Sequence, residues 1–258
     1  MKTFLLFVVL VHFVFPFASN AQVAFFPKSG VIEYEKRINV FAILEKKAET
    51  NANAEASLVL DAYKKDNPQF ITLNSKLRFN KEESLFVPEN SPPSPLASYF
   101  GEDPLMTQIN TVYMNPPAGS YIVQKNVLGN TYLLQDTLLN IKWRITDESR
   151  EIAGHLCRRA NGLMQDSIYV VAFYTNDIHL SVGPESFHGL PGAILGVALP
   201  HYHVSWFAKR VYTEGPSQKS IQQPTKGQPV RYNELRGILI DLSQSTSSVA
   251  RVIDRYLF

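Results

Sequence analysis

The sequence predicts a mainly β protein, built as a single antiparallel, strongly curved sheet or partly open barrel with short helices at its C-terminal end. Two observations predict this fold. Apolar and polar residues alternate with a period of two in many short runs, and turn-forming residues separate these runs. Strands joined by short turns favour an antiparallel meander, because parallel strands need long crossover connections.

The first predicted strand covers residues 31–40. One face of this run is apolar and the other is polar, which is typical of a half-buried strand. The apolar face consists of Ile32, Tyr34, Ile38 and Val40, and the polar face of Glu33, Glu35, Arg37 and Asn39.

Two hairpins and several single strands are expected to follow. Residues 77–79 and 85–87 form the first predicted hairpin. Residues 121–127 and 132–138 form the second, with Gly129 and Asn130 where a positive φ is needed. Four further runs are rich in β-branched and aromatic residues, which favour strands: 141–145, 168–174, 193–199 and 202–207.

The remaining segments are loops and helices. Residues 51–65 could form a short helix, and 90–95 read N-S-P-P-S-P, a proline-rich loop. Residues 214–230 are rich in Gln, Pro, Gly and Ser and predict a polar linker or loop. Residues 231–258 predict a helical tail, split near 243–248, within a single β-rich domain spanning 22–258. The apolar residues with helical spacing are Leu235, Ile238, Leu239 and Leu242, then Val249, Val252, Ile253 and Tyr256.

Residues 1–21 predict a cleavable signal peptide. Lys2 provides a positive charge, 4–17 are almost purely apolar, and Ser19 and Ala21 occupy the positions that a signal peptidase reads. The apolar run is shorter than the roughly 18–20 residues of a spanning helix, so a retained anchor is the less favoured alternative. No cysteine follows the run, which excludes a lipoprotein anchor. We therefore expect export, with no stable membrane insertion after cleavage.

Charge and cysteine content exclude several functions. The formal net charge is +2 and no basic block stands out, so no nucleic-acid partner is expected. Cys157 is the single cysteine, so no internal disulfide can form. We expect this thiol to be buried, the alternatives being a reactive nucleophile or an intermolecular disulfide.

Residues 141–211 form a dense block of motifs that identifies a family. In order, they are Trp143, Ile152-x-Gly154-x-x-Cys157-x-x-Ala160, Phe173-Tyr174-Thr175, Gly183-Pro184 and Gly189-Leu190-Pro191-Gly192-Ala193-Ile194. The block resembles the GLPGLI family of secreted bacterial proteins, with Ala193 where that family usually has Leu. The resemblance implies a Gram-negative protein that is periplasmic, outer-membrane associated or secreted. It assigns no catalytic residue, and it implies an accessory role beside an outer-membrane receptor.

The signature itself is interpreted as a structural turn. Residues 190–193 suit a type II turn, with Pro191 at its second position and Gly192 at the third, where φ is positive. Gly183, Pro184 and Gly189 are expected to form turns in the stretch that precedes it. The alternative is a loop whose exposed backbone binds a ligand.

Metal and catalytic sites are not favoured. His201 and His203 share one face of the predicted strand, and His155 and Cys157 have the same spacing, so a zinc site is conceivable. However, the apolar face of that strand would direct both histidines into solvent, and nothing fixes the two pairs together. We therefore assign no metal ligand.

Ser186 and His188 resemble a nucleophile and its base, but the G-x-S-x-G elbow and its strand–turn–helix context are missing. The paired carboxylates Glu33/Glu35 and Asp147/Glu148 occupy solvent-facing or turn positions. No phosphate-binding glycine loop or dinucleotide fingerprint is present, so no cofactor is expected. No catalytic residue is assigned.

The sequence favours a non-enzymatic binding or accessory module of the envelope. Its 16 Phe and 12 Tyr suit either a β core or the lining of a concave apolar site. The expected partner is an apolar or extended ligand, such as a lipid or peptide, or part of an outer-membrane receptor. The alternatives are a hydrolase with an unrecognised site and a structural interaction protein with no pocket.

Overall fold

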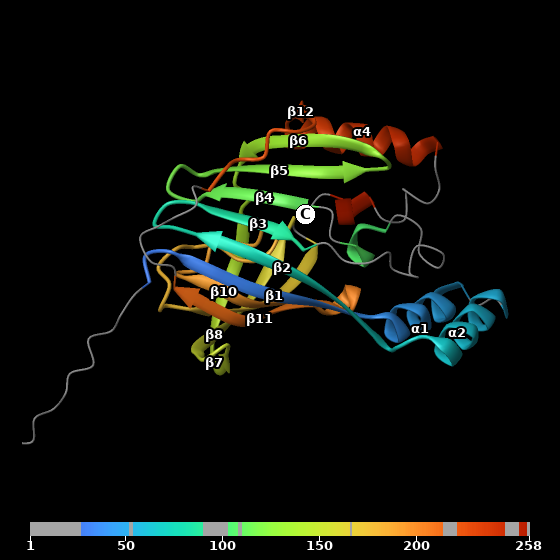
Figure 1. Cartoon of the computed structure of the whole chain (residues 1–258). Helices are drawn as coiled ribbons and strands as arrows, with labels where there is room; N and C mark the ends of the chain where they lie inside the picture. The colour runs from blue at the N-terminus through green and yellow to red at the C-terminus, as the bar shows by residue number, and fades with distance from the viewer. Residues whose placement is uncertain are drawn as a thin grey trace, which may run out of the picture.

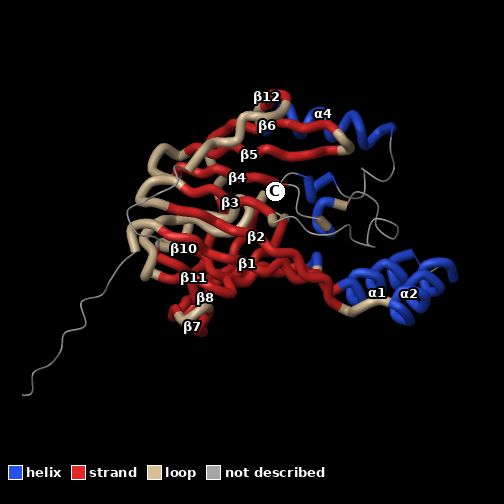
Figure 2. Tube along the Cα trace, in the orientation of Figure 1, coloured by secondary structure: helices blue, strands red, loops and turns tan. Residues whose placement is uncertain are grey.

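The computed structural model describes residues 27–51, 54–89, 103–107, 110–165, 167–213, 221–245 and 253–256. Within them the chain forms one twelve-stranded, mostly antiparallel sheet that is not closed into a barrel, together with three α-helices (Figures 1 and 2). The prediction of a mainly β protein with a single antiparallel sheet is confirmed. The predicted signal peptide and the proline-rich loop at 90–95 lie outside the described residues.

Two meanders meet at the centre of the sheet, where β1 pairs with β11. The strand order is β12-β6-β5-β4-β3-β2-β1-β11-β10-β9-β8-β7. The first meander consists of β1 (Gly30–Asn39), β2 (Phe70–Phe79), β3 (Ser84–Pro88), β4 (Asn110–Asn115), β5 (Ser120–Val127) and β6 (Asn130–Thr137). The second consists of β7 (Ile141–Ile152), β8 (His155–Met164), β9 (Ile168–Thr175), β10 (Ala193–Leu199) and β11 (Val204–Thr213). The sheet bends, so that β7 and β8 pass behind the first meander in Figure 1.

Strand β1 shows the predicted alternation with one addition. Ile32, Tyr34 and Ile38 are buried on one face, and Lys36 is buried among them. The strand ends one residue earlier than predicted, because the Asn39 side chain accepts a hydrogen bond from the Ala42 N–H (3.2 Å) and caps a helix. Val40 therefore begins α1 instead of ending the strand.

Helices α1 (Val40–Asn51) and α2 (Ala54–Asp66) form a hairpin that projects from the ends of β1 and β2 (Figure 1). The helix expected over 51–65 corresponds to α2. Leu44 and Tyr63 are buried between the helices, and the Phe41 and Tyr63 rings meet edge to face at 6.2 Å. Among the described helices, none combines the length and the apolar character that a membrane crossing requires.

The turn between β5 and β6 corrects a detail of the predicted hairpin. Its two residues are Leu128 and Gly129, with φ of 50° and 82°, as in a type I′ turn. Asn130 is already the first residue of β6. The polar side chain that supports the turn is Asn126, which accepts a hydrogen bond from the Gly129 N–H (3.0 Å). The predicted positive φ is therefore correct for Gly129 and wrong for Asn130.

The C-terminal part contains a strand that the sequence did not predict. Within the expected linker at 214–230, β12 (Gln228–Val230) pairs in parallel with residues 132–134 of β6. The first predicted tail helix is confirmed as α4 (Tyr232–Ser245), which buries Leu235 and Leu239. Of the second predicted helix the structure describes residues 253–256, which form a 3-10 helix, η3 (Ile253–Tyr256).

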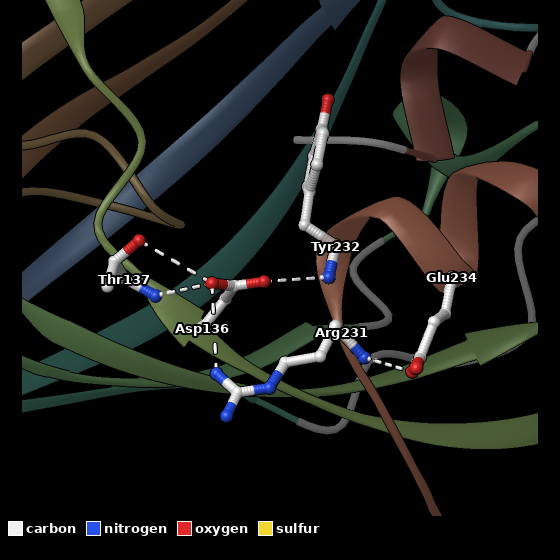
Figure 3. A network of polar contacts seen from close by, with 5 residues as sticks. All are labelled: Asp136, Thr137, Arg231, Tyr232 and Glu234. Atoms are coloured by element: carbon white, nitrogen blue, oxygen red, sulfur yellow. Dashed lines mark hydrogen bonds and ion pairs between the residues drawn. The ribbon is translucent and has the colours of Figure 1, made fainter.

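A polar network fixes α4 against β6 (Figure 3). Arg231 precedes the helix and has no side-chain acceptor for the free N–H groups of its first turn. Asp136 of β6 supplies that acceptor, because its carboxylate receives a hydrogen bond from the Tyr232 N–H (2.9 Å). Glu234 in turn accepts from the Arg231 N–H (2.8 Å), as in a capping box. The hydrogen bond from Tyr232 is the main reason that the pKa of Asp136 is lowered.

The inner face of the sheet is covered by the chain itself. The connection between β9 and β10, residues 176–192, buries Ile178, Leu180, Val182 and Phe187. A short 3-10 helix, η1 (Pro104–Met106), is also buried, and it lies beside η3 near the same end of the sheet as the α1–α2 hairpin (Figure 1). This end of the inner face contains the candidate site.

Candidate functional site

The loop of residues 176–192 places one carboxylate inside the fold. Glu185 is buried, with φ at +51°, a left-handed conformation that is uncommon for a residue with a side chain. Asn110 of β4 donates a hydrogen bond from Nδ2 to Oε2 of Glu185 (2.9 Å). Strained backbone of this kind often accompanies functional sites. Glu185 therefore marks the place where the signature loop meets the inner face of β4.

Lys36 reaches the same region from β1. Position 36 faces inward because Tyr34 and Ile38 do, and its side chain is buried with them. Its Nζ donates to the carbonyl oxygen of Thr107 (2.6 Å) and lies 5.0 Å from the centre of the Trp206 ring, a cation–π distance. Burial lowers the pKa of Lys36 to about 8, although Glu185 and Asp103 act in the opposite direction.

Lys125 enters from β5, where it is the cross-strand partner of Asn110. It is also buried, and its Nζ donates to the carbonyl oxygen of Tyr256 (2.6 Å). Burial lowers the pKa of Lys125 to about 8, opposed by Glu185. The pKa of Glu185 is itself raised by burial, opposed first by Lys36. We call Lys36, Asn110, Lys125 and Glu185 the inner cluster.

Two short segments close the site, and we call residues 103–107 and 253–256 the cover. Asp103 caps η1, because its Oδ1 accepts a hydrogen bond from the Leu105 N–H (3.0 Å). The Asp103 carboxylate also pairs with the guanidinium of Arg255, which joins the two segments of the cover. The two buried lysines therefore hold the cover through the carbonyls of Thr107 and Tyr256.

Little free space remains beside the inner cluster. A cavity of about 10 Å³ is lined by Asn110, Lys125 and Tyr121, among others. That is room for a single water molecule. In this conformation the inner cluster faces polar groups of its own chain, and a ligand could reach it only if the cover moved.

The inner cluster was missed by sequence analysis, although a signal for it exists. Lys36 and Lys125 both fall on the inward phase of an otherwise apolar alternation, where a charged residue is expensive to bury. Glu185 lies between Pro184 and the rest of the signature stretch, but its polar partners come from β1, β4 and β5. Such a cluster can be found from sequence only if each charged residue in an inward position is treated as a site candidate.

The signature turn is tighter than predicted. The Gly192 N–H donates to the carbonyl oxygen of Leu190 (2.8 Å), which is the hydrogen bond of a γ-turn centred on Pro191. A type II turn would bond the Ala193 N–H to Leu190, but that group donates to Ile178 (3.0 Å). The type II assignment is therefore wrong. The positive φ predicted for Gly192 is present, at +146°.

Much of the rest of the signature stretch is buried and bonded within the fold. Gly183, Pro184 and Leu190 are buried, and the exposed Gly189 donates from its N–H to Oγ of Ser181 (2.8 Å). Trp143 of β7 donates from Nε1 to the carbonyl oxygen of His188 (2.8 Å), which attaches the loop to an end strand of the sheet. These contacts are those of a structural element.

Ser186 and His188 meet through a local backbone contact, not as a nucleophile and its base. Nδ1 of His188 donates to the backbone carbonyl of Ser186 (2.8 Å), and burial lowers the pKa of this imidazole. The paired carboxylates on the outer face have cationic neighbours: Glu33 lies 3.4 Å from Lys76, Glu35 lies 3.3 Å from Lys209, and Glu148 lies 2.5 Å from Arg159. Exposed pairs of this kind are solvated surface contacts.

The histidines and the cysteine do not come together. His201 lies in a 3-10 helix, η2 (Pro200–Tyr202), and His203 adopts a left-handed conformation before β11 begins at Val204. The strand predicted from residue 202 therefore starts two residues later, and the two imidazoles do not share a strand face. His155 instead bonds to Asp177 (2.7 Å). Among the described residues, no group of three or more His, Cys, Asp or Glu side chains is placed to hold a metal.

Cys157 is buried, as predicted, and burial raises the pKa of its thiol to about 12. A thiol with so high a pKa has almost no thiolate at neutral pH. Its position therefore supports a packing role for Cys157.

The buried lysines predict an unusual dependence of stability on pH. Each has a pKa of about 8 in the folded protein and 10.5 as its ordinary value, so the unfolded chain binds more protons between these values. The free energy of unfolding should rise by about 1–2 kcal/mol between pH 8 and 9, measured by urea denaturation. Tyr34 and Cys157, whose pKa values are raised, oppose this trend at higher pH.

Lys36→Met combined with Lys125→Met should remove this rise. Methionine keeps the length of the side chain without a titrating group, so the comparison isolates the two ammonium groups. A wild-type protein that loses stability between pH 8 and 9 would contradict the burial of charged lysines.

Comparisons with known proteins give a short family match and distant structural likenesses. Residues 162–196 match a family described as a protein of unknown function (Porph_ging). No curated protein matches this sequence.

Three solved structures are similar in outline. Two are structures of PNGF-II in different space groups, with 14% and 12% identity, a TM-score of 0.48 and 79% of this chain covered. The chain spans about a third of the length of PNGF-II, 32% and 30%. The third, an uncharacterized conserved protein from Thermus thermophilus, has 6% identity and a TM-score of 0.37, over 80% of this chain and 91% of that one.

Proposed function

We propose that this protein is an exported, non-enzymatic binding module of the bacterial envelope, which holds an apolar or extended ligand against the inner face of its strongly curved sheet. One observation supports this proposal above the others. The inner face of β2 to β6 carries a run of buried apolar residues, and the inner cluster beside it is closed by the two short segments of the cover. The sheet would then act as a partly open barrel whose contents can be exchanged.

The apolar surface runs across five strands. Strands β2 to β6 each contribute one buried, inward-facing residue to it. These residues are direct cross-strand partners, each of the next: Leu77, Phe86, Val112, Val123 and Leu134. We call this set the apolar row. An apolar ligand packed along it would gain roughly 25 cal/mol for each Å² of apolar surface removed from water.

The cover consists of short segments, and its contacts include lysine hydrogen bonds to the carbonyls of Thr107 and Tyr256 and the pair between Asp103 and Arg255. Arg255 also lies 5.4 Å from the centre of the Tyr202 ring. Leu105, Met106 and Tyr256 supply its buried apolar surface. Short segments open at a lower free energy than a sheet does. Opening of the cover would free polar and apolar surface together.

The proposed compartment rests on the sequence. The predicted signal peptide at 1–21 and the resemblance of residues 141–211 to the GLPGLI family support an envelope location, and the Porph_ging match at 162–196 fits an uncharacterised family. An outer-membrane receptor, or an apolar or peptide ligand, is the partner that this location favours.

Native mass spectrometry of freshly exported protein tests the proposal. We expect a bound species, and we expect binding of an apolar, environment-sensitive fluorophore to the emptied protein. Arg255→Ala should strengthen fluorophore binding, because it breaks the pair with Asp103 and loosens the cover. Arg236→Ala, at an exposed position of α4, is the matched control and should have no effect. Protein that is always empty and never binds the fluorophore would contradict the proposal.

A further inference from the structure

A groove lies on the outer face of the sheet, opposite to the inner cluster. It is formed where β1 and β10 end and β11 begins, at the end of the sheet from which the α1–α2 hairpin projects (Figure 1). It is open to solvent, and its volume of about 360 Å³ falls within the usual range of ligand sites. We call it the outer groove, and its lining includes Arg37, Phe70, Ala198, Pro200, Ser205 and Phe207.

Small residues form the floor of the outer groove, and an aromatic ring forms one wall. Ser205 of β11 pairs with Ala198 of β10, and both lie on the face opposite to Trp206. Phe207 is the cross-strand partner of Gly196, where an added β-carbon would lie 2.6 Å from the Phe207 ring. The ring therefore lies directly over the glycine, and packing against the sheet holds this wall in place.

An arginine lies at each side of the outer groove, supported by aromatic rings. The guanidinium of Arg37 lies over the Phe70 ring, 4.5 Å from its centre. At the other side Arg150, from the far end of β7, lies 5.0 Å from the centres of both the Phe207 and the Phe173 rings. A ring beneath a guanidinium restrains it and leaves the edge of the fork able to donate two parallel hydrogen bonds.

The charge around the outer groove is positive. Both arginines are exposed, and no carboxylate of the described residues lies within ion-pair distance of either. Glu35, two residues before Arg37 on the same face of β1, lies 3.3 Å from Lys209. Lys46 adds a third positive charge beside the groove, where its Nζ donates to the carbonyl oxygen of His201 (3.0 Å). The charge that complements this surface is therefore negative.

The shape of the outer groove favours an extended peptide among anionic ligands. The rings at its sides already carry guanidinium groups, so these faces are not free to stack on a sugar. A concave floor of small residues admits a side chain, whereas the flat head-group layer of a membrane could not enter it.

The spacing of the two arginines also suits a peptide. The Arg150 guanidinium lies over β10, between rings from β11 and β9, and Arg37 belongs to β1, two strands away. Two strand spacings are about 10 Å. In an extended peptide the first and fifth residues share one face and lie about 13 Å apart, and flexible acidic side chains span the difference.

We propose that the outer groove binds an extended, acidic segment of a partner protein. Two acidic side chains of that segment accept paired hydrogen bonds from Arg37 and Arg150. An apolar side chain between them packs against Ala198 and Phe207. The site lies on the face opposite to the inner cluster, so it does not depend on the proposed exchange of an apolar ligand there.

Fluorescence anisotropy with a labelled, capped pentapeptide tests the inference. The peptide has glutamate at both ends, leucine in the middle and serine at the positions between. The wild-type protein should bind it about 10-fold more tightly than the analogue with glutamine at both ends, as expected for hydrogen bonds between charged groups. Arg37→Gln and Arg150→Gln should each reduce this preference about threefold, because each removes one of the two forks. Arg78→Gln, at an exposed position of β2 outside the groove, is the matched control and should keep the preference.

Two further variants separate the fork from the charge and from the shape of the groove. Arg37→Lys keeps the positive charge without the fork, so it should recover only part of the preference lost in Arg37→Gln. Ala198→Leu fills the floor and should weaken the binding of both peptides while the ratio of their affinities stays the same. Thermal unfolding should give the wild-type melting temperature for the arginine variants, because these side chains are exposed.

Three results would overturn the inference. The first is equal affinity for the two peptides, and the second is no binding of either at millimolar concentration. The third is binding of anionic phospholipid vesicles or of an acidic polysaccharide with the same dependence on Arg37 and Arg150, because the outer groove would then recognise that ligand instead of a peptide.

Discussion

Glu185→Gln is expected to lower the free energy of unfolding by about 1–3 kcal/mol at neutral pH, because the buried ammonium groups of Lys36 and Lys125 lose the carboxylate that favours their charged form. Glutamine has nearly the same shape and can still accept the hydrogen bond from Asn110. The substitution therefore removes only the charge that opposes the lowering of the pKa of Lys36 and Lys125. The loss should shrink above pH 8, where these two ammonium groups release their protons.

Urea denaturation of matched variants measures this effect. Glu33→Gln makes the same change on the outer face of β1, where Glu33 lies 3.4 Å from Lys76, and it should cost less than about 1 kcal/mol. Addition of Lys36→Met to the Glu185→Gln variant should restore part of the stability, because one uncompensated charge is then removed. If Glu185→Gln costs no more than Glu33→Gln, the three buried groups do not form a coupled cluster.

The strands were predictable from sequence because their pattern is local. Alternation between buried and exposed residues identifies β1 and the β5–β6 hairpin without any knowledge of their neighbours. The pairing of β1 with β11 joins residues 30 and 213, and no local pattern reports a contact between segments so far apart. The three residues of β12 are too few to show alternation, so the linker prediction failed there.

In the candidate site, too, local features were predictable from sequence and long-range contacts were not. Lys36 is visible in the sequence as a charge on an apolar face, but its acceptor, Thr107, belongs to a segment with no strand or helix pattern of its own. The second half of the cover comes from residues 253–256, more than a hundred positions further along the chain. The inward position of each lysine was therefore predictable. The cluster was not, because it depends on tertiary contacts among six segments: β1, β4, β5, the loop of residues 176–192 and the two segments of the cover.

Gly192→Ala is expected to destabilise the fold by about 2–6 kcal/mol. The φ of +146° is strained for any residue with a β-carbon, and such strain costs about 1–3 kcal/mol. A β-carbon would also lie 2.0 Å from the carbonyl oxygen of Thr175, a backbone atom at the end of β9 that cannot turn away. Overpacking of this kind adds about 1–3 kcal/mol. Relief of the clash would separate β9 from the loop and weaken the bond from Ala193 to Ile178.

Gly237→Ala provides the matched control, because the same methyl group has a different setting there. Gly237 lies inside α4 with open space around the β-carbon position, so alanine should stabilise the helix by about 0.5–1 kcal/mol. Thermal and urea unfolding should therefore give opposite signs for the two variants. Equal melting temperatures for Gly192→Ala and the wild-type protein would mean that the signature loop adapts to a side chain. The glycine of the signature would then have to be explained by a partner that contacts it, and the γ-turn could no longer account for it.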